Sequence, residues 1–216
     1  EFFGRREPRT GAGLAALASA HLAAGDEAKA KALARKVWRE HEMASTLEAG
    51  FLERFGRLLA EADHKRRLDL VLVDEGRLKS SRSDRAAMAR RLVPRLAEGE
   101  RKKAEARIAA FTRARNATQL MAALPATPAD AKDWGLVFQR AQLARVQDRN
   151  EEAAALLRTA PTDKDSLIDP DAWWFERRLV AYDLLRADKA KLAYEVVKVP
   201  GPLTVNPLKD ATYLAG

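Results

Sequence analysis

The chain has 216 residues and a mass of 23.9 kDa, enough for one large domain or one continuous helical array. Apolar residues make up 47% of it and charged residues 32%, a balance typical of a folded protein with a well-hydrated surface, and the net charge is +8. The absence of cysteine excludes disulfide bonds and thiolate metal sites, and no apolar run reaches the roughly 20 residues that a membrane-spanning helix needs.

Taken in chain order, the predicted elements are helices. Residues 1–6 lack the basic-then-apolar order of a signal peptide, so we expect that the natural protein begins earlier. Beyond them, apolar residues recur three and four positions apart, which is the spacing of one helix face. These stripes span residues 14–22, 30–38, 51–59, 68–72, 88–96, 104–111, 120–124, 134–141, 153–157 and 190–197. The sequence therefore predicts an all-α protein with about eleven or twelve helices.

Three helix starts are marked by a capping residue directly before proline, at Thr127-Pro128, Asp169-Pro170 and Asn206-Pro207. Proline fits the first position of a helix and moves the preceding residue out of the α region, as a cap requires. We therefore predict helices that begin near residues 128, 170 and 207. Residues 199–207, with three prolines, predict a loop, and residues 76–83 predict a basic, polar connection. We expect the helix after Pro207 to continue in a longer natural protein.

A weak internal repeat runs through the chain. Residues 22–26, 146–150 and 184–188 each close one helix with a short polar turn, and each is followed by a helix whose first apolar residues are alanines. Small side chains there let two antiparallel helices approach closely. This pattern is typical of tetratricopeptide-like and related solenoids. We therefore predict one α-superhelical domain over residues 1–216, a right-handed solenoid of antiparallel helix hairpins.

Positive charge is concentrated in the first half of the chain. Residues 1–115 contain 26 Lys and Arg against 17 Asp and Glu, whereas residues 116–216 contain 13 against 14. The favoured interpretation is an Arg-rich helical surface in water. The alternative is a face that binds an anionic polymer, such as nucleic acid, anionic lipid or an acidic glycan. Among the densest basic positions are Arg113 and Arg115.

The sequence contains no motif for catalysis or for binding a metal or cofactor. His21, His41 and His64 lie about 20 residues apart, too far for ligands on one helix face, and we expect them at the surface or at helix ends. There is no G-x-S-x-G elbow and no phosphate-binding loop with its lysine. Neighbouring carboxylates, such as Asp169 and Asp171, fall at turns and helix starts, where we expect caps and solvated charges.

Two adjacent tryptophans, Trp173 and Trp174, stand out in the second half of the chain. Neighbouring residues of a helix point about 100° apart, so we expect one ring in the core and the other over a hairpin joint or along a groove. Packing between helices is the favoured interpretation, and stacking on a sugar is the alternative. Arg177 and Arg178 follow one turn later and would place positive charge nearby.

Several segments together resemble a known family. Residues 169–180, Asp-Pro-Asp-Ala-Trp-Trp-Phe-Glu-Arg-Arg-Leu-Val, followed by Asp183-Leu184-Leu185 and Ala193-Tyr194, resemble the N-terminal α-superhelical domain of soluble lytic murein transglycosylases. The Slt-type enzymes of alphaproteobacteria are the most similar in style. Residues 51–56, 62–69, 139–142 and 210–216 are also similar, whereas the stretch around residues 75–83 looks longer and more basic than in the family.

The resemblance implies a periplasmic parent enzyme that cleaves the bond between N-acetylmuramic acid and N-acetylglucosamine and leaves a 1,6-anhydro product. In the family, a glutamate of a lysozyme-like C-terminal domain performs this reaction. Its Glu-Ser signature is absent here, so no catalytic residue is carried over and no cofactor is expected. We expect a non-catalytic domain, peptidoglycan as partner of the parent enzyme, and a catalytic domain after residue 216. Candidate contacts for glycan or anions are Arg66, Arg67, Arg91, Lys102, Lys103, Trp173, Trp174 and Arg177.

Two other functions compete with this one. A tetratricopeptide-like scaffold would bind a protein partner in a concave groove. A nucleic-acid-binding array would use the basic half, but the Lys and Arg clusters have no aromatic residues between them for stacking on bases, which disfavours this alternative.

Overall fold

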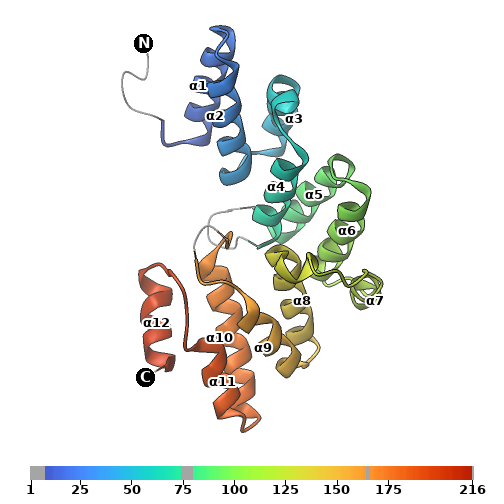
Figure 1. Cartoon of the computed structure of the whole chain (residues 1–216), viewed down its shortest axis with the longest axis vertical. Coiled ribbons are helices and arrows are strands. Elements are labelled where there is room, and N and C mark those ends of the chain that lie inside the picture. The colour runs from blue at the N-terminus through green and yellow to red at the C-terminus, as the bar shows by residue number, and fades with distance from the viewer. Residues whose placement is uncertain (1–7, 74–79, 164–165, 216) are drawn as a thin grey trace.

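The computed structural model describes residues 8–73, 80–163 and 166–215, and it is built from helices (Figure 1). These residues form twelve α-helices and three short 3-10 turns, with no strand among them, so the all-α prediction is confirmed. The helices are α1 (Gly11–Ala23), α2 (Glu27–Glu40), α3 (Ser45–Phe55), α4 (Glu61–Val73), α5 (Arg82–Leu92), α6 (Glu98–Thr112), α7 (Ala117–Ala122), α8 (Trp134–Val146), α9 (Asn150–Thr159), α10 (Pro170–Arg186), α11 (Ala190–Val197) and α12 (Val205–Ala215). Within the described segments, no helix has both the length and the apolar character of a membrane span.

The repeat predicted from the sequence corresponds to a turn that recurs with the same geometry. In each copy one residue has a positive φ, namely Gly25 at 77°, Asp148 at 59° and Asp188 at 58°. The next residue donates its N–H to the carbonyl five positions back, as Asp26 does to His21 at 2.9 Å. This left-handed residue ends one helix and reverses the chain, so that α1 packs on α2, α8 on α9 and α10 on α11. Arg113, with φ 57°, makes a similar turn between α6 and α7.

Each helix packs mainly on helices that are near it in the sequence. Beyond the hairpins, α2 packs on α4, α4 on α5, α5 on α6, α6 on α8, and α9 on both α10 and α11. The chain therefore advances from α1 and α2 at one end, through α4 to α6, to α10, α11 and α12 at the other. Figure 1 shows the result as an elongated, curved array.

The hydrophobic core has two main parts, which meet at α4. Leu68, Val71 and Leu72 belong to the core that α1 to α6 enclose. Leu70 and Val73 belong to the core of the second half, with α8 to α12. Nine of the 13 residues of α4 are buried, because this helix is covered from both directions. It is the element that joins the two halves.

A buried set of polar side chains holds α4, α6 and α8 together. Arg107, which is fully buried, donates to Asp69 Oδ1 at 2.5 Å and to Gln139 Oε1 at 2.8 Å. These groups fit only because residue 135 of α8 has no side chain. A Cβ on Gly135 would lie 2.2 Å from Asp69 Oδ1 and 2.5 Å from Arg107 Nη2, which is closer than any stable contact.

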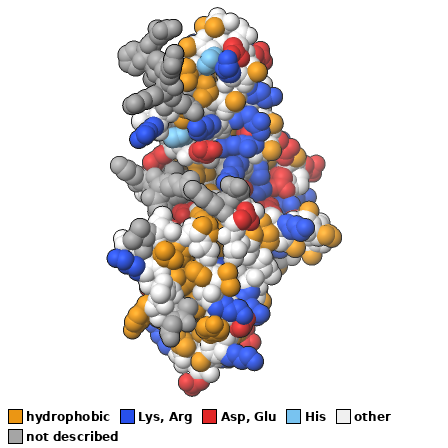
Figure 2. All heavy atoms as spheres, turned by 60° about the vertical axis from the view of Figure 1, so that its left-hand side comes forward, with side chains coloured by type: hydrophobic (Ala, Val, Ile, Leu, Met, Phe, Trp, Pro, Cys, Tyr) orange, Lys and Arg blue, Asp and Glu red, His pale blue; other side chains and the backbone are white. Residues whose placement is uncertain are grey.

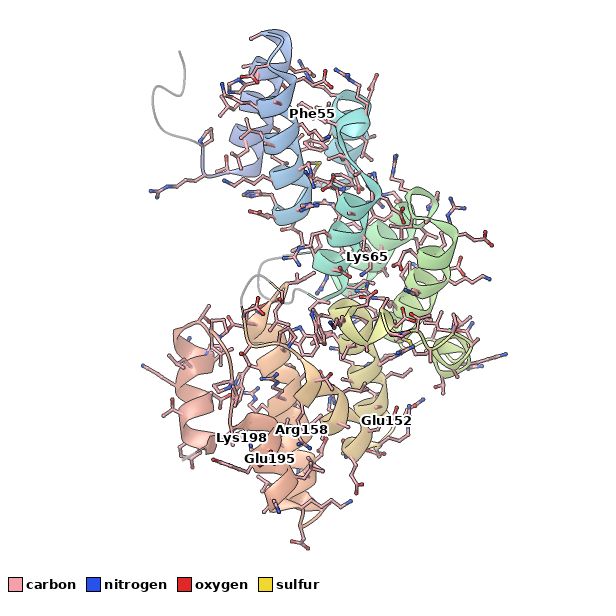
Figure 3. All side chains as sticks on the ribbon, viewed as in Figure 1. Phe55, Lys65, Glu152, Arg158, Glu195 and Lys198 are labelled. Atoms are coloured by element: carbon pink, nitrogen blue, oxygen red, sulfur yellow. The ribbon has the colours of Figure 1, made fainter. Side chains whose placement is uncertain are left out.

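Ion pairs also connect helices that lie side by side in the array. The Lys65 ammonium lies 3.0 Å from Asp69 Oδ1 and 2.9 Å from Asp133 Oδ1, and Asp133 caps the start of α8. In Figure 3, Lys65 is labelled at this joint between the halves. Figure 3 also labels Arg158 of α9, whose guanidinium lies 3.8 Å from Glu195 of α11.

Trp38 of α2 is the centre of the first core. Its ring stacks on Phe51 at 5.6 Å, meets the edge of His64 at 5.6 Å, and faces the guanidinium of Arg67 at 4.5 Å. His64 lies in the first turn of α4, a helix end as expected, but it is buried rather than exposed. Burial lowers the pKa of His64 below its usual value, and the positive charge of Arg95 adds to that effect.

The three helix starts predicted at proline have different outcomes. The start at Pro170 is confirmed, with the Asp169 carboxylate accepting from the N–H groups of Asp171 and Ala172. The start near 128 is wrong, because residues 130–132 form a 3-10 turn and α8 begins at Trp134. The start near 207 is two residues late, and residues 205–207 of the predicted loop are helical, since Pro207 is tolerated in the first turn of α12. Of the predicted connection 76–83, residues 76–79 lie outside the described residues and residues 82–83 open α5.

Candidate functional site

Two of the arginines predicted to contact a ligand are buried. Arg67 donates to the carbonyls of Trp38 at 3.0 Å and His41 at 2.8 Å. Arg177 donates to the carbonyls of Val199 at 2.6 Å and Leu157 at 3.1 Å. With 2% and 4% of their surfaces exposed, both hold loop and helix-end carbonyls inside the fold. Both were predicted as possible contacts for glycan or anions, but in this fold neither side chain is open to a ligand outside it.

The predicted tryptophan pair lies inside the fold, with each ring at 2% exposure. Trp173 packs in the second core against Phe138, at 5.1 Å between ring centres. Trp174 covers the joint between α10 and α12, where its Nε1 donates to Asp210 Oδ2 at 3.0 Å. Both rings belong to the second core, and Trp174 also covers the joint with α12, so the expectation that only one ring enters the core is wrong. Neither ring presents an open face for a sugar.

The remaining predicted contacts lie on three different helices. Arg91 of α5 donates to Glu48 Oε2 at 2.9 and 2.6 Å, and Lys103 of α6 lies 2.5 Å from Asp130 Oδ1. Arg66 of α4 is half-buried, while Lys102 is exposed and makes no ion pair with the residues that the structure describes. Of the eight predicted residues, only Trp174 lines either of the two hollows described next.

The larger hollow has a volume of about 530 Å³ and is rich in arginine. The side chains that matter for its chemistry are Arg82, Phe111, Arg113, Arg115, Arg145, Phe175 and Glu176. They come from the start of α5, the end of α6, the turn before α7, the end of α8, and α10. We call it the basic hollow.

The basic hollow keeps a positive charge after its internal pairs are counted. Arg145 is paired with the buried carboxylate of Glu176. The C-terminal ends of α6 and α8 add roughly half a negative charge each. Four arginines against one carboxylate and two helix ends leave a net charge of about +2. An anion is therefore the ligand that this hollow would attract.

The second hollow has a volume of about 450 Å³ and lies between α10 and α12. Its lining includes Asp169, Asp171, Trp174, Phe175, Arg178, Asn206 and Asp210. We call it the aromatic–carboxylate hollow. Phe175, 42% exposed, borders both hollows and carries Arg178 over its ring at 5.1 Å.

Several polar groups of the aromatic–carboxylate hollow are already used within the fold. Asp171 accepts from Thr204 N–H at 3.0 Å and from its hydroxyl at 2.6 Å, which holds the loop before α12. Asp210 accepts from Trp174 and Arg178 through Oδ2 alone. Its Oδ1 and the amide of Asn206 make no hydrogen bond with the described residues. They can therefore offer a ligand one acceptor, from Asp210, and one group that both donates and accepts, from Asn206.

The sequence alone indicated only part of the lining of these two hollows. Arg113 and Arg115 belong to the basic half that the charge distribution marked. Arg82 was predicted only as part of the basic connection 76–83, and Phe111 only as part of an apolar stripe. Their approach depends on α5 packing against the end of α6, where Arg82 donates to Phe111 O at 2.9 Å. Phe175 was part of the aromatic run after Pro170, and its exposure was the missing information.

No group of three or more His, Cys, Asp or Glu side chains in the described part of the chain is arranged to hold a metal ion. The basic hollow and the aromatic–carboxylate hollow differ in the charges of their linings. Comparisons with protein families, with curated proteins and with solved structures gave no match to this chain.

Proposed function

We propose that the chain is a non-catalytic superhelical domain of a periplasmic peptidoglycan lytic transglycosylase and that it holds glycan at the aromatic–carboxylate hollow. One observation carries the proposal. Residues 169–180, the segment that resembles this family most, form the first part of α10 and supply much of the lining of that hollow. The segment chosen on sequence grounds thus coincides with a hollow whose chemistry suits a sugar.

The chemistry of the hollow supports this ligand class. A pyranose ring has an apolar face, which the exposed ring of Phe175 can cover, and hydroxyl groups that both donate and accept. Asp210 Oδ1 offers an acceptor, and the Asn206 amide offers both kinds of group. Binding pockets for small ligands combine apolar walls with a few such oriented polar groups.

The order of the helices supports a right-handed, tetratricopeptide-like superhelix. The hairpins α1–α2, α8–α9 and α10–α11 share the same left-handed turn, and helices pack mainly on their neighbours in the sequence. Such arrays form scaffolds that hold a ligand or another domain. In this proposal, cleavage of the glycan belongs to another domain of the parent enzyme, and the periplasmic location follows from its substrate.

The test is sedimentation of the purified chain with isolated peptidoglycan sacculi. We expect the wild type to sediment with sacculi and Phe175→Ala to bind about tenfold more weakly, which corresponds to one aromatic contact. Because Phe175 borders both hollows, Asn206→Ala, which changes only the aromatic–carboxylate hollow, should also weaken binding. The matched control is Tyr194→Ala, an exposed aromatic residue of α11 outside both hollows. Absence of sedimentation, or equal loss with Tyr194→Ala, would contradict the proposal.

A second candidate function is a tetratricopeptide-like scaffold for a protein partner. The observation that favours it is a group of exposed large apolar residues in the second half of the chain, Phe175, Tyr182, Leu185, Tyr194, Val199, Leu208 and Tyr213. Figure 2 shows hydrophobic side chains over the lower part of one face of the molecule, with many Lys and Arg side chains above them. If the purified chain does not sediment with sacculi, that result would favour this scaffold function.

A further inference from the structure

We propose that the basic hollow is a binding site for a short carboxylate-rich peptide with apolar side chains. This inference rests on the contacts and charges of that hollow and is independent of glycan binding at the neighbouring one. Its volume of about 530 Å³ lies within the range of sites for small ligands, and a short stretch of extended peptide is a ligand of that size.

Two arginines of the hollow are available to a ligand. Arg113 and Arg115 are exposed, and their side chains make no hydrogen bond or ion pair with the described residues. Arg113 is fixed at the end of α6 in the left-handed conformation, with its N–H bonded to Ala110 O at 3.1 Å. A rigid backbone therefore presents guanidinium groups that can each receive a carboxylate through two parallel hydrogen bonds.

The other two arginines are held in place by the fold. Arg82 donates one N–H to Phe111 O at 2.9 Å and lies over the Phe111 ring at 5.1 Å, which leaves its remaining donors free to turn toward the hollow. Arg145 is fixed by the buried Glu176. These contacts orient positive charge before a ligand arrives, so less conformational entropy is lost on binding.

The distribution of the charges favours a peptide over a single phosphate group. The four arginines come from three separate segments around the hollow: the start of α5, the turn between α6 and α7, and the end of α8. A site for a single phosphate group would instead place its donors around one point. Between them lie apolar side chains, among them Phe111, Leu143 and Leu179, and the amides of Gln142 and Gln147. A peptide with separated carboxylates, apolar side chains and backbone amides matches these three kinds of surface. Its carboxylates suit the arginines, its apolar side chains suit the apolar lining, and its backbone amides suit the glutamine amides.

The experiment measures fluorescence anisotropy of a labelled hexapeptide of alternating Glu and Leu with the whole chain at low salt. We expect saturable binding that weakens at higher salt, because exposed ion pairs are screened over about 10 Å at 0.1 M. The double variant Arg113→Gln/Arg115→Gln should bind at least about tenfold more weakly, the effect of losing two exposed charge pairs. The hexapeptide with Gln in place of Glu should not bind.

The matched control is Arg54→Gln/Lys102→Gln, which removes the same charge from exposed residues that form no ion pair with described residues and lie outside both hollows. It should keep the affinity within about twofold, since only distant charges change. Equal loss in this control, binding of the Gln peptide, or no saturation would overturn the proposal. Binding of a single-stranded oligonucleotide that the same double variant abolishes would overturn the peptide class. Because sedimentation with sacculi is tested with Phe175 and Asn206 variants, either proposal can fail while the other stands.

Discussion

At the scale of single residues, the fold depends on charges that are buried in pairs. Asp130 is 1% exposed and lies 2.5 Å from the Lys103 ammonium, while Thr127 donates to its Oδ2 from both N–H and hydroxyl. The ammonium of Lys103 is the main reason that the pKa of Asp130 is lowered to about 2. This one carboxylate thus fixes the 3-10 turn before α8 onto α6.

The first prediction concerns the pH dependence of stability at this turn. A carboxylate whose pKa is lower in the folded state stabilises the fold above its unfolded pKa of 3.8 and loses that contribution as the pH falls toward 2. We therefore expect Asp130→Asn to be less stable than the wild type at pH 7. The difference should shrink as the pH falls from about 4 to 2. Urea unfolding followed by circular dichroism at a series of pH values measures this, and a difference that stays constant over that range would contradict it.

The second prediction concerns Gly135, the point of closest approach between α8 and the buried pair. Gly135→Ala would push Asp69 and Arg107 apart, so we expect a loss of about 3 kcal/mol in the free energy of unfolding. The control is Gly50→Ala in α3, where nothing lies within 4 Å of the added Cβ. That change should stabilise the chain by about 0.5–1 kcal/mol, because alanine is the better helix former. Similar changes in the free energy of unfolding at both positions would show that helix propensity, not crowding by the added Cβ, determines the effect.

At the scale of elements, local signals gave most helices but not all their ends. Asp169 caps α10, and the signal for this start is local because the capping residue and Pro170 are adjacent in the sequence. Thr127 offers the same local signal, yet its partner Asp130 is drawn to Lys103, 27 residues earlier, and the helix starts later with Asp133 as its cap. A long-range ion pair thus overrides a local cap.

The third prediction concerns the docking of α12. Trp174 and Arg178 of α10 both donate to Asp210 Oδ2 at 3.0 Å. Trp174→Phe removes one donor from a partly buried carboxylate, at a cost of about 1–3 kcal/mol. We expect the amides of α12 to exchange with deuterium about tenfold faster, while those of α4 keep their rates. Tyr213→Phe, on the exposed side of α12, is the control and should change neither set. Slow exchange in α12 of Trp174→Phe would mean that apolar packing alone holds this helix.

At the scale of the whole molecule, α4 decides whether the array behaves as one body. It contributes residues to both main cores. Arg107 of α6 donates to its Asp69, and Gln139 of α8 donates to its Leu72 carbonyl. Helical arrays are stabilised by contacts between neighbours, so a weak joint divides them into parts that unfold separately. We expect the buried contacts of Asp69, Arg107 and Gln139 at α4 to prevent the two halves from unfolding separately.

The fourth prediction is that Arg107→Met uncouples the two halves. It leaves Asp69 with only Lys65 as a charged partner among the described residues and Gln139 without its main donor, which should cost about 3–5 kcal/mol. We expect the wild type to unfold in one transition, with circular dichroism and tryptophan fluorescence coinciding. In a Trp38→Phe background, where fluorescence reports only the second half, Arg107→Met should separate the two curves. Exposed Arg54→Met, the control, should leave them coincident.

The sequence by itself determined the helical class, the approximate number of helices, the recurring turns and the start of α10. These depend on apolar spacing, caps and left-handed residues, which act over five residues or fewer. Tertiary structure decided which charged residues are buried, which tryptophan covers a joint, and where the two hollows lie. The pairs that decide these features, such as Arg107 with Asp69, are 38 residues apart, and Arg67 and Arg107 look like surface arginines until neighbouring helices cover them. Burial is a property of packed helices, and a local pattern of residues does not contain it.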